Sequence, residues 1–193
     1  MSSLKERIDQ LEQDLKATPM RISVFRDLPF AILRYDPAEE WTLRSEQRLL
    51  ATRLQMARRE VVTISLADLL WEAIEECEGI DVLVRQERRD GFAAAQSQVT
   101  TYLSDPKWAP LADLLAQRLA GLDPTRQIVF LTRAAALAPD HFPISSLLDR
   151  MQGRTEVTTI LFYPGIQEGE LQLRFMNMPH RNALGTYRVK LYS

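Results

Sequence analysis

Three apolar runs in the chain each end abruptly in polar or turn-forming residues. They are Phe30–Tyr35 before Asp36-Pro37, Gln127–Thr132 before Arg133, and residues 158–163 before Pro164-Gly165. Apolar runs of this length without alternation are typical of strands buried on both faces of a parallel sheet. A fourth run, residues 61–64, is β-branched and also predicts a strand.

Helical periodicity fills the intervals between these strands. Leu4, Ile8, Leu11 and Leu15 predict an amphipathic helix that ends before Pro19 and packs on its own domain. Further helices are expected over residues 38–58, 66–78, 80–103 with a break at Asp90-Gly91, 111–119 and 144–152. Residues 66–121 are therefore expected to form a helical insertion without a strand.

The C-terminal part of the chain predicts a change of strand direction. Pro164-Gly165 and Gly169 indicate a turn into a strand over 171–176, and residues 187–192 alternate like an edge strand. Alternating strands and helices predict an α/β fold with a mainly parallel open sheet, helices on both faces and an antiparallel edge near the C-terminus. We expect one domain over residues 1–193, with the N-terminal helix, residues 1–18, packed on it.

Composition narrows the range of functions only slightly. The formal net charge of −2 gives no overall attraction to nucleic acid, so direct nucleic-acid binding is not expected. No apolar stretch approaches the roughly 20 residues that a membrane-spanning helix needs, and the N-terminus is charged, so we expect a cytoplasmic protein. The single cysteine, Cys77, excludes an internal disulfide bond.

The polar residues that follow the strands are the first candidates for a ligand site. In open α/β sheets, ligands bind beyond the carboxyl ends of the strands. Two interpretations are open: a crevice in which an arginine binds a phosphate or a partner's carboxylate, or an internal network that holds the loops. The residues concerned are Arg34, Tyr35, Asp36, Arg133 and Tyr163.

Motifs for catalysis are missing from the sequence. The segment after the first strand, residues 34–41, reads RYDPAEEW, with no glycine, no lysine and three carboxylates where a phosphate-binding loop would lie. Nucleotide hydrolysis in the usual way is therefore not expected. No G-x-S-x-G elbow places a nucleophilic serine. We expect no catalytic residue, no metal and no cofactor.

One helix carries a concentration of negative charge. Between Leu66 and Val84 there are six acidic residues and no basic one. Four of the acids share a helical face, with Trp71 at its border: Asp68, Glu72, Glu75 and Glu76. We call these four residues the acidic face. It is interpreted as a solvated surface, as a docking surface for a basic partner or, since no histidine lies nearby, least readily as a metal site.

Seven segments resemble the BrxB family of bacterial BREX phage-defence systems. They are LPFAILRYDP (28–37), SLADLLWEAI (65–74), TYLSDP (101–106), FLTRAAALAP (130–139), LFYPG (161–165), LRFM (173–176) and YRVK (187–190). The resemblance implies a small non-enzymatic component of a system that restricts phage and methylates host DNA. Its implied partners are the phosphatase-like PglZ first, then the ATPase BrxC or the methyltransferase PglX. It transfers no catalytic residue.

Two hypotheses of function follow. The first is a non-catalytic adaptor that holds BREX proteins together through its acidic face, helical insertion and arginines. The second is a regulatory domain that senses a nucleotide at the strand ends without hydrolysing it.

Overall fold

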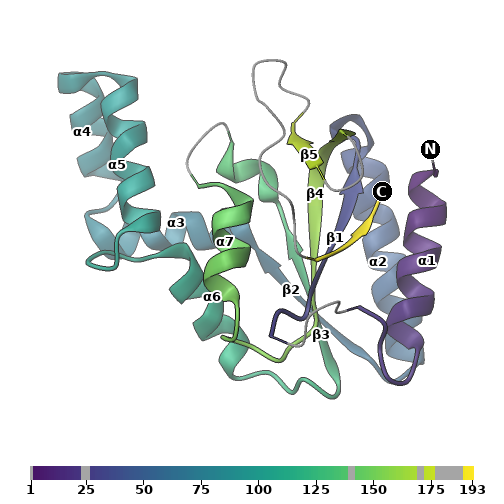
Figure 1. Cartoon of the computed structure of the whole chain (residues 1–193). Helices are drawn as coiled ribbons and strands as arrows, with labels where there is room; N and C mark the ends of the chain where they lie inside the picture. Colours follow the sequence, from purple (N-terminus) through teal and green to yellow (C-terminus); the bar gives the residue numbers. More distant parts are fainter. Residues whose placement is uncertain (1, 23–26, 139–141, 169–171, 177–188) are drawn as a thin grey trace.

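The fold is a mainly parallel open sheet with helices on both faces, seen in a computed structural model (Figure 1). The structure describes residues 2–22, 27–138, 142–168, 172–176 and 189–193. The main sheet has the strand order β2-β3-β4-β1-β6, and β5 pairs with β4 alone. The predicted α/β class is confirmed.

The elements follow the hydrophobic pattern closely. The strands are β1 (Phe30–Tyr35), β2 (Glu60–Ser65), β3 (Gln127–Thr132), β4 (Thr159–Glu168), β5 (Gln172–Phe175) and β6 (Lys190–Tyr192). The α-helices are α1 (Leu4–Lys16), α2 (Glu40–Met56), α3 (Leu66–Cys77), α4 (Ile80–Asp90), α5 (Phe92–Ser104), α6 (Leu111–Ala120) and α7 (Ile144–Met151). Two short 3-10 turns, η1 (Pro37–Glu39) and η2 (Ala134–Leu137), follow β1 and β3. The sequence also predicts a short extended segment over residues 21–25, which lies largely outside the described residues.

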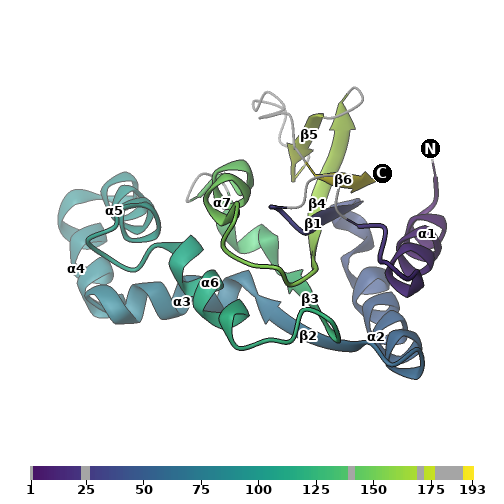
Figure 2. The ribbon, with the colours of Figure 1, turned by 60° about the horizontal axis from the view of Figure 1, so that its bottom comes forward.

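Each face of the sheet has its own hydrophobic core. On one face, buried leucines of α1 and α2, such as Leu11 and Leu50, pack with Ala31 and Leu33 of β1. On the other, α3, α6 and α7 pack on the alternate strand residues, including Phe30 and Ile32. Figure 2 shows α1 and α2 together on one side of the molecule and α3, α6 and α7 on the other. The N-terminal helix thus packs on the sheet of its own chain.

The connections place the ends of three strands side by side. From β1 the chain crosses through α2 to the far edge at β2, and then returns through β3 to β4, which pairs with β1. All pairs within the main sheet are parallel, so the carboxyl ends of β1, β3 and β4 meet at one edge. This is the neighbourhood that a strand-end crevice requires.

The turn predicted between Pro164-Gly165 and Gly169 does not begin at Pro164, whereas the strand predicted over 171–176 is confirmed as β5. β4 runs through Pro164 and Gly165 to Glu168 and then pairs antiparallel with β5, so that Gly165 lies opposite Phe175. Proline fits at position 164 because its bond to this part of the chain uses its carbonyl oxygen, which accepts from the Met176 N–H. That bond does not need the N–H group that proline lacks. Glycine is required because a Cβ at position 165 would lie 2.2 Å from the Arg174 carbonyl oxygen. Pro164 and Gly165 therefore mark the place where β4 and β5 approach each other closely.

The antiparallel element near the C-terminus is β5, whereas the last strand, β6, pairs parallel with β1 at the sheet edge. β6 is joined to α1 by side chains. The Asp14 carboxylate accepts hydrogen bonds from Lys190 Nζ at 2.7 Å and from the Tyr192 hydroxyl at 2.8 Å. This Asp14–Lys190–Tyr192 cluster connects the N-terminal helix to the final strand.

The helical insertion contains a projecting hairpin. α4 and α5 pack chiefly on each other, and α5 also packs on α3 and α6. Figures 1 and 2 show this pair of helices standing away from the sheet, beyond α3 and α6. We call α4 and α5 the arm. The break expected at Asp90-Gly91 is the junction between its helices, where Gly91 has a φ of 87°.

Candidate functional site

A strand-end crevice lies between α2 and the turn η2. Its two neighbouring hollows have volumes of about 330 and 140 Å³ and share the side chains Tyr35, Glu40, Arg44 and Arg133. The smaller hollow also reaches Gln47, Thr63 and Thr132. The crevice therefore draws on β1, β2, β3 and α2, at the edge where open α/β sheets bind ligands.

One wall of the crevice is a chain of bonded side chains. The Tyr35 hydroxyl donates to one oxygen of Glu40, and Arg44 Nε donates to the other at 2.7 Å. The guanidinium of Arg44 also lies over the ring of Trp41, 4.8 Å from its centroid. Burial, followed by the hydrogen bond to Glu40, raises the pKa of Tyr35, so its hydroxyl stays protonated at neutral pH. This wall is internally satisfied.

Arg133 also lines the crevice, but its side chain is not bonded to its neighbours as the side chains of Tyr35, Glu40 and Arg44 are. Its backbone is left-handed, with a φ of 57°, which is uncommon for a residue other than glycine. Its side chain is exposed and makes no hydrogen bond or ion pair with any residue that the structure describes. The guanidinium of Arg133 is therefore available to bind a ligand in the crevice, since it pairs with no described residue.

The other predicted strand-end residues are not in the crevice. The Asp36 carboxylate caps η1 by accepting from the Ala38 N–H at 2.9 Å. Tyr163 is buried and packs edge-on against Phe175, with ring centroids 5.4 Å apart. Arg34 is buried and lies next to Tyr163 in the β1–β4 register. Of the five candidates, Tyr35 and Arg133 line the crevice.

Sequence reasoning missed Glu40 and Arg44 as lining residues of this site. The signal was present, because Glu40 and Arg44 are four residues apart at the start of a predicted helix, where such pairs face each other. Thr63 and Thr132 carried a weaker signal as hydroxyl residues near the ends of β2 and β3. The crevice can bind an anion through Arg133, with the Thr63 hydroxyl beside it, since the Thr132 hydroxyl already donates to the Ile64 carbonyl oxygen.

The acidic face has few partners within the part of the chain that the structure describes. Asp68, Glu75 and Glu76 are exposed on α3, and Trp71 beside them is 53% exposed. Glu72 differs, because it forms an ion pair with Arg118 of α6. The other three carboxylates make no side-chain bond with a described residue. The structure thus brings four of the five predicted residues to the surface and uses Glu72 to attach α3 to α6.

The arm continues this surface with apolar side chains. Phe92, the first residue of α5, is 63% exposed, and Ile80 and Val84 of α4 are also exposed, one helical turn apart. Leu83 is the buried residue of α4. At the base of the arm, the hydroxyl of Tyr102 in α5 donates to Glu78, and its ring centroid lies 5.0 Å from that of Trp108. The arm is anchored at one end and open to solvent along α4.

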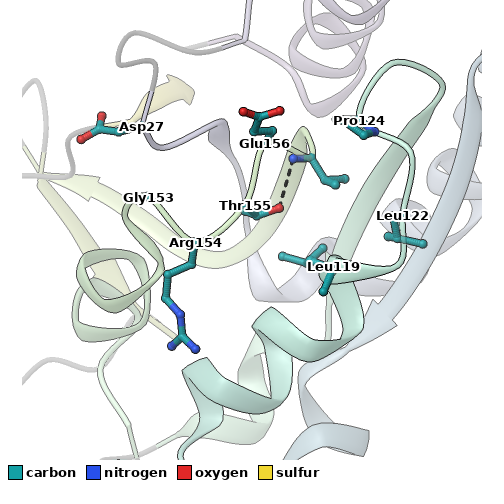
Figure 3. Close-up of a pocket in the computed structure, with 10 residues that line it drawn as sticks. Asp27, Leu119, Leu122, Pro124, Gly153, Arg154, Thr155 and Glu156 are labelled. Carbon is teal, nitrogen blue, oxygen red and sulfur yellow. Dashed lines mark hydrogen bonds between the residues drawn. The ribbon is translucent and has the colours of Figure 1, made fainter.

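A further pocket lies at the opposite ends of the strands (Figure 3). It has a volume of about 410 Å³ and lies between the loops that follow α6 and α7. Arg154 is turned away from its centre in Figure 3 and binds Asp113 of α6 at 2.6 Å. The Thr155 hydroxyl accepts from the Val157 N–H at 3.1 Å. The Arg154 and Thr155 side chains that line this pocket are thus already engaged in bonds to other residues of the protein.

Two classes of feature are missing from the part of the chain that the structure describes. No cluster of three or more histidine, cysteine, aspartate or glutamate side chains is arranged to hold a metal ion there. No described helix is both long and apolar enough to cross a membrane. Cys77 is partly buried, and burial raises the pKa of its thiol.

Comparison with known proteins identifies the family. The family model described as BREX protein BrxB matches residues 62–191, which is well over half of the chain. No curated protein sequence and no solved structure matches it. The matched range includes α3, the arm, η2, β3, β4 and β5. The chain therefore belongs to the BrxB family, a family of components of the BREX phage-defence systems.

Proposed function

We propose that this protein is a non-catalytic adaptor that binds another BREX protein through the acidic face and the arm. PglZ is the first candidate for the partner, with BrxC or PglX next. The observation that carries the proposal is the arm itself. Its two helices pack chiefly on each other and present apolar and charged side chains to solvent.

The arm has the composition of an interface. Aromatic residues are enriched where proteins bind one another, and Phe92 and the neighbouring Trp71 of α3 are large aromatic side chains that the fold leaves exposed. Ordinary solvent-facing helices carry polar residues at such positions. A partner that covered these two rings would remove apolar surface from water, which favours association.

The acidic face supplies selectivity for a basic partner. Asp68, Glu75 and Glu76 present their charges to solvent from the helix that supports the arm. Charges at the edge of an interface mainly accelerate association and exclude partners of like charge. We therefore expect the partner to present lysine or arginine residues around an apolar patch.

The experiment is co-purification of the full-length protein with PglZ, BrxC and PglX in turn. The test variant combines D68K, E75K and E76K, and the matched control combines D9K, E60K and E156K, which make the same change in net charge at exposed acids on other segments. We expect the first variant to lose the partner and the control to keep it. Equal binding by both would remove the acidic face from the proposal, and no binding by the unmodified protein would reject the adaptor.

A second candidate function is nucleotide sensing at the strand-end crevice. Arg133 favours it, because strained backbone conformations cluster at ligand sites and its guanidinium is exposed and unpaired among the described residues. Thermal unfolding with ATP, ADP and cyclic nucleotides tests it. A sensor would be stabilised by one of them, and R133M would lose the effect. If none of these nucleotides shifts the midpoint, the candidate is rejected.

A further inference from the structure

A second arginine near the strand ends is buried without a partner among the described residues. Arg34, at the end of β1, is 7% exposed. Its Nε is fully buried and makes no hydrogen bond, and its side chain forms no ion pair with any described residue. Guanidinium groups stay charged in proteins, so the Nε–H of this cation is withdrawn from water without a hydrogen bond to any described residue.

Arg7 of α1 increases the concentration of positive charge. It is 3% exposed, and its Nε is likewise buried and unbonded. Its Nη1 donates to the Ser2 carbonyl oxygen, and its Nη2 lies 3.7 Å from Glu39. Burial, followed by the charge of Arg34, lowers the pKa of Arg7, whereas Glu39 and Glu6 act in the opposite direction. The positive charges of Arg7 and Arg34 thus act unfavourably on each other.

The carboxylates of Glu39 and Glu6, which act on the charge of Arg7, do not balance this pair. Glu39 is too far from Arg7 for a short hydrogen bond, and its side chain is 41% exposed. Glu6 is engaged in the capping box of α1, where it accepts from the Ser3 N–H at 2.7 Å. Neither carboxylate bonds to Arg34. A buried cation without a counter-ion strongly destabilises a fold, so the arrangement favours an additional anion.

The surroundings of Arg34 suit such an anion. The two terminal nitrogens of Arg34 have no bond to a described residue, yet only its Nε is fully buried, so these nitrogens keep contact with solvent. Figure 1 shows the N-terminus of α1 at the same end of the molecule as the carboxyl end of β1. Helix N-termini attract anions through their dipole and free N–H groups.

We propose that Arg34, with Arg7 beside it, binds a small oxyanion, namely a phosphate or carboxylate group, between the N-terminus of α1 and the end of β1. Arginine recognises both groups through paired hydrogen bonds. The site is distinct from the strand-end crevice, whose described lining contains neither arginine. The proposal is independent of the adaptor function. A bound oxyanion would join α1 to the sheet, as the Asp14–Lys190–Tyr192 cluster does further along that helix.

The experiment measures thermal unfolding of the full-length protein in inorganic phosphate, acetate or ATP, each against chloride at equal ionic strength. The variants are R34M, R34K and, as a control for the other crevice, R133M. A parallel readout is the side-chain Nε–H signal of Arg34 in nuclear magnetic resonance spectra during a phosphate titration. Inorganic phosphate tests a free ion, acetate a carboxylate, and ATP a phosphate attached to a larger group.

We expect at least one oxyanion to raise the unfolding midpoint of the unmodified protein, and to raise it also in R133M, in which the strand-end crevice has lost its unpaired guanidinium. At a concentration 100 times its dissociation constant, it would raise the folded-to-unfolded ratio about 100-fold. R34M should lose this response without a lower midpoint in chloride, and R34K should retain part of it. The proposal is overturned if no oxyanion stabilises the protein, if R133M rather than R34M removes the effect, or if the Arg34 signal does not move.

Discussion

Asp14 shows how single residues hold this fold together at its edge. It is 9% exposed and accepts bonds from Lys190 and Tyr192, which lie at the other end of the sequence. Burial alone would raise the pKa of Asp14, but the hydrogen bonds from Lys190 and Tyr192, with the Lys190 charge, outweigh it and lower the pKa overall. The ionised carboxylate is therefore the form that the fold stabilises.

We predict that D14N destabilises the protein by about 2 kcal/mol, because it weakens one charge-assisted hydrogen bond and removes an ion pair. Urea unfolding at pH 7 measures the change, with D9N, an exposed acid on the same helix, as the control. Since the folded-state pKa is lowered, this stabilisation is present above the usual value of 3.8 and is lost as the pH falls below it. The difference between D14N and the unmodified protein should shrink below about pH 4. A constant difference would contradict this account.

Residue-level prediction succeeded where the signal was local. Neighbouring side chains of a strand point to opposite faces of the sheet, yet nothing in the sequence shows that Tyr35 reaches the crevice while Arg34 is buried outside it. That outcome depends on which helices cover each face. The bond between Asp14 and Lys190 was equally inaccessible, because it joins residues that only the strand order brings together.

At the scale of elements, the β4–β5 pair depends on a single glycine. A Cβ at position 165 would meet the Arg174 backbone, which cannot move aside like a flexible side chain. We predict that G165A costs about 1 to 3 kcal/mol, in the range for overpacking, and lowers the protection of β5 amides in hydrogen exchange. G121A is the control, since it has open space and an ordinary backbone conformation. Equal stability of both variants would show that β5 does not pack as described.

The same strand pair explains the principal error in predicting the elements. Proline followed by glycine is among the strongest local signals for a turn, and at Pro164-Gly165 that signal is overridden by pairing with β5. Local rules detect the conformational freedom of glycine but not the approach of another strand. Elsewhere the periodic segments were long enough to predict the helix, as in α3, where the Ser65 side chain also caps the helix by accepting a hydrogen bond from the Asp68 N–H.

At the scale of the whole molecule, the sheet and the arm have different roles. The sheet separates the two cores and carries the strand-end crevice, whereas the arm projects beyond α3 and α6 with aromatic surface exposed. The sequence patterns predicted the helical insertion and its break, because both are local. They did not predict that the insertion projects from the body, since this depends on how α5 packs against α3 and α6.

The most direct test of the adaptor proposal is hydrogen exchange of the full-length protein with and without PglZ, BrxC or PglX, using whichever co-purifies with it. The account predicts slower exchange of amides within residues 66–104, which include the acidic face and the arm, and unchanged exchange in β1 and β4. The variant combining D68K, E75K and E76K should show no such protection. Protection confined to the sheet or to α1, with the arm unchanged, would contradict the account.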